Sequence, residues 1–182
     1  MSTHAKFVQA IAAAPDAATW SMACVGLADS MWWFSAATLA DGTSASSKDL
    51  YVAAITLAAD TSAVAKGYVG LGDTLWRGQQ ATVNGTRVGK ATAYAQAAAL
   101  DVDARLTSRA YLGLASTLWW APRAEQEAGG MREAYLKVIA LAADGAMVAE
   151  AYRGLHVSMA PDETVTLHDG TVMSRGELSK RR

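Results

Sequence analysis

Gly70-Leu71-Gly72-Asp73-Thr74-Leu75-Trp76 is one of four heptapeptides in this chain that share a residue pattern. Each begins with Gly-Leu, carries a hydroxyl residue at its fifth position and has Leu or Met at its sixth position. The other three copies are residues 26–32, 113–119 and 154–160. Self-similarity at a long, regular interval is the sequence signature of repeat architectures, so these four segments decide the fold.

Two further positions keep a constant distance from the first glycine of every copy. An aspartate precedes that glycine by ten residues, and an aromatic residue precedes it by nineteen. The aspartates are Asp16, Asp60, Asp103 and Asp144, and the aromatic residues are Phe7, Tyr51, Tyr94 and Tyr135. All variation in repeat length falls between the heptapeptide and the next aromatic residue. Because packed elements tolerate no insertions and surface loops do, each constant block is predicted to be a helix, a tight turn at the aspartate and a second helix.

Apolar spacing and capping residues support these two helices. In the second copy the apolar stripes are Tyr51, Ile55 and Ala58, followed by Val64, Tyr68, Leu71 and Leu75. This spacing gives each helix one apolar face, and aspartate is a favoured N-cap for the second helix. A glycine inside a helix costs roughly 1 kcal/mol relative to alanine. Its recurrence in every copy predicts that a neighbouring helix approaches closely there.

The long connections carry a signature of their own. It consists of the tripeptides Asp41-Gly42-Thr43, Asn84-Gly85-Thr86 and Asp169-Gly170-Thr171. Asn-Gly and Asp-Gly favour type I′ turns, so residues 82–88 and 165–172 are predicted to form small hairpins. The first two tripeptides begin ten residues before Tyr51 and Tyr94. By that alignment, residues 169–182 open a truncated fifth unit, with a capping box between Ser174 and Glu177.

The predicted fold is therefore all-α. It is one domain over residues 1–182, an α-solenoid of about four helical-hairpin repeats with a period of 41–44 residues and units that start near residues 7, 51, 94 and 135. The pattern Tyr68-x-x-Leu71-Gly72-x-x-Leu75 resembles the first helix of a tetratricopeptide (TPR) repeat, and residues 10–16 resemble the end of its second helix. The resemblance implies a degenerate TPR-like array with extended loops inside its hairpins. HEAT-like helical pairs, whose period is closer to this one, are the alternative.

A second face of each second helix ends in a tryptophan in the first three copies: Trp32, Trp76 and Trp119. In the fourth copy this face is polar, with Arg153 and His156, as the capping repeat of a solenoid requires. The pattern predicts that the three tryptophans pack between repeats. A row of ligand-binding tryptophans is the alternative.

Three more aromatic residues lie next to the long connections: Trp33, Phe34 and Trp120. They either pack beneath those loops or form an exposed anchor. Exposed tryptophans are favoured hot spots of protein interfaces, so these three residues are the predicted partner-binding site.

The composition disfavours several classes of protein and partner. Sixteen Lys and Arg against seventeen Asp and Glu leave a net charge of -1, which favours neither nucleic acid nor a membrane as partner. One cysteine rules out a disulfide within the chain. No apolar run is long enough for a membrane span, and the N-terminal residues lack the features of a signal peptide. A cytoplasmic protein is predicted, with a virion or another assembled particle as the other possible setting.

No combination of residues predicts catalysis, a metal ion or a cofactor. The three histidines lack metal-ligand spacing. Cys24 falls on a core position, where it is a small hydrophobe and not a nucleophile. Asp29 and Asp73 are one repeat apart, which indicates surface carboxylates and not an acid–base pair. The recurring hydroxyls, Ser30, Thr74, Thr117 and Ser158, are expected to bond back to their own helix backbone.

The leading hypothesis for function is a non-enzymatic scaffold that binds a protein or peptide, since solenoids present extended surfaces. The alternative is a self-assembling structural protein, such as a filament, a shell or a virion component. In that case the first helix of one copy would stack on the last repeat of another copy, which gives rings or filaments. An enzyme, which would need a pocket formed by the long connections, is the third hypothesis.

Overall fold

A computed structural model describes residues 2–32, 35–121 and 130–181. This part of the chain is mostly helical and contains three antiparallel two-stranded sheets. It divides into two compact units, residues 1–102 and 103–182. The division falls inside the third predicted hairpin, between its two helices. The single domain and the four-repeat solenoid stay predictions.

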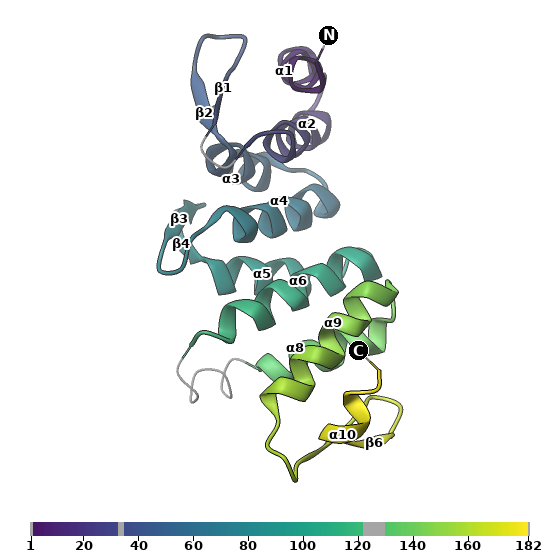
Figure 1. Cartoon of the computed structure of the whole chain (residues 1–182). Coiled ribbons are helices and arrows are strands. Elements are labelled where there is room, and N and C mark those ends of the chain that lie inside the picture. Colours follow the sequence, from purple (N-terminus) through teal and green to yellow (C-terminus); the bar gives the residue numbers. More distant parts are fainter. Residues whose placement is uncertain (1, 33–34, 122–129, 182) are drawn as a thin grey trace. The chain divides into compact units, whose positions relative to one another are not determined.

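The first unit is a row of helices in which short turns alternate with β-hairpins (Figure 1). Its helices are α1 (Thr3–Ala13), α2 (Ala17–Asp29), α3 (Ser47–Leu57), α4 (Thr61–Thr74) and α5 (Lys90–Ala99). Its strands are β1 (Ala36–Thr38), β2 (Ser44–Ser46), β3 (Gln80–Val83) and β4 (Thr86–Gly89). Each helix packs against the next one in the sequence. The hairpins β1–β2 and β3–β4 stand between helical pairs, where the long connections were predicted.

The second unit has helices and a β-hairpin of the same kinds. It contains α6 (Ala104–Leu118), α8 (Met131–Leu141), α9 (Gly145–Ser158), β5 (Thr164–Thr166), β6 (Val172–Ser174) and the short α10 (Arg175–Leu178). Helix α8 packs against both α6 and α9, and α10 packs against α9. Each unit buries its own apolar core, which lies between its consecutive helices and extends beneath its hairpins.

The four turn aspartates cap the second helices, as predicted. The carboxylate of Asp60 accepts hydrogen bonds from the N–H groups of Ser62 and Ala63, both at 3.2 Å. Equivalent bonds begin α2, α6 and α9. They satisfy N–H groups that the first turn of a helix leaves without an intrahelical partner.

Three of the four mid-helix glycines face an aromatic ring of the preceding helix, which confirms the predicted close approach in these copies. The pairs are Phe7 with Gly26, Tyr51 with Gly70 and Tyr135 with Gly154. In each pair the ring occupies the space that a β-carbon on the glycine would need. The missing side chain therefore lets the ring lie directly on the backbone of the second helix.

In the first unit, tyrosine hydroxyls join neighbouring helical pairs. Tyr51 on α3 donates a hydrogen bond to the carboxylate of Asp29 on α2 (2.5 Å), and Tyr94 on α5 donates one to Asp73 on α4 (2.6 Å). The Tyr94 ring also lies against Gly72 on α4, where a β-carbon would be 2.8 Å from Cε1. Asp29 and Asp73, predicted to be plain surface carboxylates, are acceptors that tie one helical pair to the next.

Hairpins form at all three Gly-containing tripeptides, but with two kinds of turn. Asn84 and Gly85 have φ values of 48° and 78°, as the predicted type I′ turn requires. In the other two turns only Gly42 and Gly170 have positive φ, and their N–H groups donate to the carbonyl three residues earlier. Type I′ is therefore wrong for both Asp-Gly sites, because their loops hold a third residue and end in a left-handed glycine.

The C-terminal segment resembles the segment that leads into α3. Ser174 and Glu177 form the predicted capping box at the start of α10, and Leu178 is buried. The Nδ1 atom of His156 lies 2.9 Å from the carbonyl oxygen of Arg175, whose Nε donates to the carbonyl of His156. The polar face that was predicted to end the solenoid is thus partly covered by α10.

We expect Gly70→Ala to destabilise the first unit by about 1–3 kcal/mol, because the new methyl group overlaps the Tyr51 ring. The better helix propensity of alanine offsets roughly 1 kcal/mol of the clash. Gly145→Ala is the control, since a β-carbon there meets no atom within 4 Å. Urea unfolding followed by circular dichroism compares the variants, and a Gly70→Ala protein as stable as wild type would contradict the contact.

We expect Tyr51→Phe to lower the free energy of unfolding by about 1–2 kcal/mol, because it removes a hydrogen bond to a carboxylate. Tyr68→Phe is the matched control, because the half-buried Tyr68 hydroxyl has no hydrogen-bond partner among the described residues. Denaturant unfolding measures both. Equal effects of the two substitutions would mean that the bond to Asp29 contributes nothing.

Candidate functional site

Only one of the three predicted partner-binding residues can be placed. Trp33 and Phe34 lie outside the described residues. Trp120 comes shortly after α6 and is 68 % exposed. The connection that follows it, residues 122–129, lies outside the described residues, so the choice between an exposed anchor and a side chain packed beneath that loop stays a prediction.

The tryptophans predicted to pack between repeats lie largely at the surface. Trp32 is 86 % exposed and Trp76 is 54 % exposed, whereas Trp119 packs partly against the core of the second unit. The packing prediction is wrong for the first two. Helix α2 ends at Asp29 and α4 ends at Thr74. Both tryptophans therefore follow the end of the helix and do not lie on the helix face that the repeat pattern predicted.

Hydroxyl side chains mark these helix ends. Ser30, Thr74 and Ser158 each donate to the carbonyl three residues earlier, at 2.7, 2.9 and 2.8 Å. This confirms the predicted back-bonding. In these three copies the hydroxyl at the fifth position of the heptapeptide lies at the end of the helix, where such a bond competes with regular helical hydrogen bonding.

Trp120 stands at the rim of a pocket of about 860 Å³ in the second unit. The pocket is lined by Trp119 and Trp120, by the start of α8 and by the residues around the end of α9. Met131 and Met159 are buried in its apolar floor, and Val157 is exposed beside it. Pockets of this size with an apolar floor and a few polar groups are typical of ligand sites.

A fixed arginine forms the polar wall of this pocket. The guanidinium of Arg132 makes a two-pronged ion pair with Glu163 and donates through Nη2 to the carbonyl of Ser158 at 2.6 Å. Glu163 also accepts the N–H of Ala160 at 3.0 Å. The arginine thus neutralises the carbonyl end of α9 and holds the following turn in place. No motif in the sequence points to this pair, since its members lie 31 residues apart.

The pocket lining carries a small excess of negative charge. Arg132 is balanced by Glu163, and Glu133 adds a second carboxylate. Among the described residues, the ion-pair partners of Glu133 are distant and partly exposed: Lys137 at 3.8 Å and His168 at 3.7 Å. Exposed pairs of this kind contribute little, so Glu133 is available to a cationic group on a ligand.

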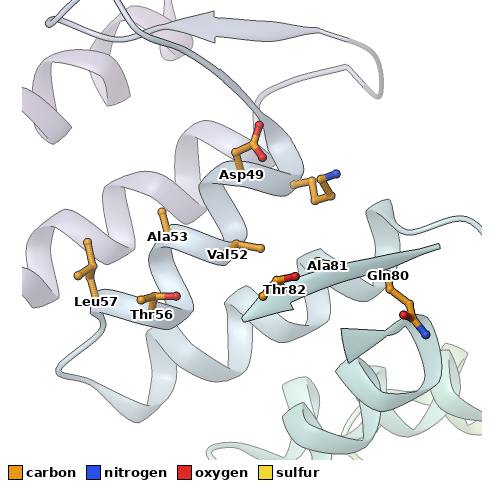
Figure 2. A pocket seen from close by; sticks show the side chains of 9 residues that line it. Asp49, Val52, Ala53, Thr56, Leu57, Gln80, Ala81 and Thr82 are labelled. Atoms are coloured by element: carbon orange, nitrogen blue, oxygen red, sulfur yellow. The ribbon is translucent and has the colours of Figure 1, made fainter. Parts of the chain in front are cut away.

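The first unit has a groove of about 650 Å³ between α3 and β3 (Figure 2). Val52, Ala53 and Leu57 form its apolar side, and Val52 lies across from Thr82 of β3 (Figure 2). Lys48 and Asp49 also line the groove. The sequence does not reveal this groove, because the groove forms where helix α3 meets the β3–β4 hairpin, which follows α4 in the chain.

The described residues offer little chemistry. No group of three or more His, Cys, Asp or Glu side chains among them is placed to hold a metal ion. Cys24 is fully buried, and burial raises the pKa of its thiol to about 12. The thiol is therefore neutral at physiological pH and packs as a small apolar side chain, as predicted.

Because the Cys24 pKa is raised by burial, we expect its reaction with a thiol-specific reagent at pH 8 to be slow in the folded protein. In the unfolded chain the thiol regains a pKa near 8.5, so the reaction should accelerate by roughly 10³-fold or more. Ellman's reagent with and without guanidinium chloride measures this. Similar rates in both conditions would contradict the buried position.

No family model, curated protein or solved structure matches this chain. Within the described residues, no helix is both long and apolar enough to span a membrane.

Proposed function

We propose that this chain is a non-enzymatic scaffold that binds a protein or peptide, built as a TPR-like α-solenoid of four helical-hairpin repeats. The Trp120 pocket carries the proposal. It combines an exposed tryptophan, an apolar floor and a prearranged ion pair. These are the features that concentrate binding energy at protein interfaces.

Recurring contacts support the helical array. Ring–glycine contacts occur in the first, second and fourth helical pairs. Tyrosine–aspartate hydrogen bonds join the first helical pair to the second, and the second to helix α5 of the third. A β-hairpin follows the second helix of the first, second and fourth pairs. A solenoid extends such nearest-neighbour contacts along the whole chain.

The pocket indicates the chemistry of the partner. Its floor of Met131 and Met159 suits a large apolar side chain, and methionines adapt to varied shapes. Glu133 at the lining favours a Lys or Arg close to that side chain. A peptide segment with an aromatic or aliphatic residue next to a basic one meets both requirements.

Self-assembly through head-to-tail stacking is the weaker alternative. It needs the outer face of α9 to receive the first helix of another copy. That face already contacts α10, through Leu178 and the mutual hydrogen bonds of His156 and Arg175. None of the exposed large apolar side chains of the described residues belongs to α1, so the other stacking surface is also poorly suited.

We expect Trp120→Ala to weaken peptide binding at least about tenfold, the usual effect of removing a tryptophan hot spot. Random linear peptides displayed on phage are selected on the full chain, and fluorescence anisotropy then measures the affinity of each synthetic peptide. Circular dichroism should show unchanged helicity, since Trp120 is mostly exposed.

Trp76→Ala is the matched control, because it removes an exposed tryptophan of the first unit. The selected peptides should bind this variant as they bind the wild type. Full binding to Trp120→Ala would reject the pocket as the site. If Trp120→Ala and Trp76→Ala lose peptide affinity equally, we would instead infer that the tryptophans that follow the second helices share the binding.

A further inference from the structure

The groove between α3 and β3 is lined along one side by a strand edge. Gln80, Ala81 and Thr82 of β3 form this side, and no residue of β4 contributes to the lining. In the described part of the chain β3 pairs only with β4. The groove therefore lies on the side of β3 away from β4, where a further strand would pair.

The register of the hairpin sets which backbone groups point into this space. Val83 and Thr86 flank the two-residue turn, and such a pair exchanges two backbone hydrogen bonds. Along an antiparallel ladder, hydrogen-bonded pairs alternate with pairs that are not hydrogen-bonded to each other. Ala81 and Val83 are therefore the residues of β3 that bond to β4. Gln80 and Thr82 direct their N–H and C=O groups away from β4, and these groups have no hydrogen-bond partner among the described residues.

The opposite side of the groove is apolar and helical. Val52 and Ala53 are half-buried, and Leu57 is 54 % exposed. The groove thus leaves apolar side chains of α3 and the outward backbone groups of β3 in water. Asp49 is held by Ser46 in the capping box of α3, and Lys48 lies beside it, so the groove carries no net charge.

We infer that this groove binds an extended polypeptide segment, which adds to β3 as a third strand. An extended backbone presents N–H and C=O groups at every second residue, and this spacing matches the free groups of Gln80 and Thr82. Alternate side chains of the segment then face Val52, Ala53 and Leu57. A helix cannot occupy the edge in this way, since its backbone groups are already bonded to one another.

This inference rests on the proposed function only in taking a polypeptide as the partner, because it uses a different surface. The groove accepts uncharged, β-branched or aromatic segments, whereas the Trp120 pocket favours a segment with a basic residue. The two sites can therefore be told apart by the peptides that they select and by the variants that abolish binding.

Thr82→Pro tests the strand edge directly. Proline removes the outward N–H of residue 82 while leaving the bonds of Ala81 and Val83 to β4, and edge strands tolerate it. Displayed random linear peptides are selected on the full-length Trp120→Ala protein, so that only sites other than the Trp120 pocket contribute. We expect Thr82→Pro to weaken the selected peptides at least about tenfold and Thr82→Ala, which keeps the N–H, to change their affinity less than about threefold.

Amide hydrogen exchange gives an independent readout on the protein without the proline. In the free protein, the amides of Gln80 and Thr82 should exchange faster than those of Ala81 and Val83. Bound peptide should slow exchange at Gln80 and Thr82. If Thr82→Pro fails to fold, Ala53→Glu places a charge on the apolar side of the groove and should cause the same loss.

Several outcomes would overturn the inference. Peptides whose binding survives both Thr82→Pro and Ala53→Glu, or no selected peptide at all, would reject the groove as a peptide site. Selection that yields peptides on the wild-type protein but none on the Trp120→Ala protein would reject the groove while preserving the proposed function. Slow exchange at Gln80 and Thr82 in the protein alone, with a dependence on protein concentration, would assign the edge to a second copy of this chain.

Discussion

The contact between an aromatic ring and a glycine of the next helix underlies the rest of this structure. The ring of Tyr51 lies where the side chain of residue 70 would be, so the two helices of that hairpin approach more closely than most side chains allow. The same tyrosine then uses its hydroxyl to reach Asp29 on the preceding helix. One side chain thus fixes the spacing within a helical pair and the attachment of that pair to its neighbour, while Phe7 can perform only the first task.

This double role explains why the helical framework could be predicted from the sequence. Glycine at mid-helix and tyrosine nineteen residues earlier are both costly or uncommon choices, so their recurrence stands out against a background rich in alanine. The N-cap aspartates and the capping box of Ser174 are equally local signals. Each of these features depends on residues whose spacing cannot change without breaking the contact.

The surfaces could not be predicted in the same way. Trp76 occupies a regular repeat position, and its periodicity resembles that of a packed residue, yet the helix ends two residues before it. Apolar spacing does not record where a helix stops, whereas the hydroxyl of Thr74, bonded back to Leu71, does. Arg132 and Glu163 carried no signal at all, because their ion pair joins the start of one helix to the turn after another.

The difference follows from where the chain tolerates change. Ring–glycine contacts hold the helical pairs to a fixed spacing, but the connections vary in length and sequence, as surface loops do. Both candidate sites use them: β3 supplies one side of the groove, and the turn that holds Glu163 completes the Trp120 pocket. If the proposed function holds, substitutions in a connection alter what is bound while the pairs of rings and glycines keep the spacing of the helices. In the described residues the ring–glycine contacts belong to the helices, whereas the lining of each candidate site combines helix residues with residues of a connection.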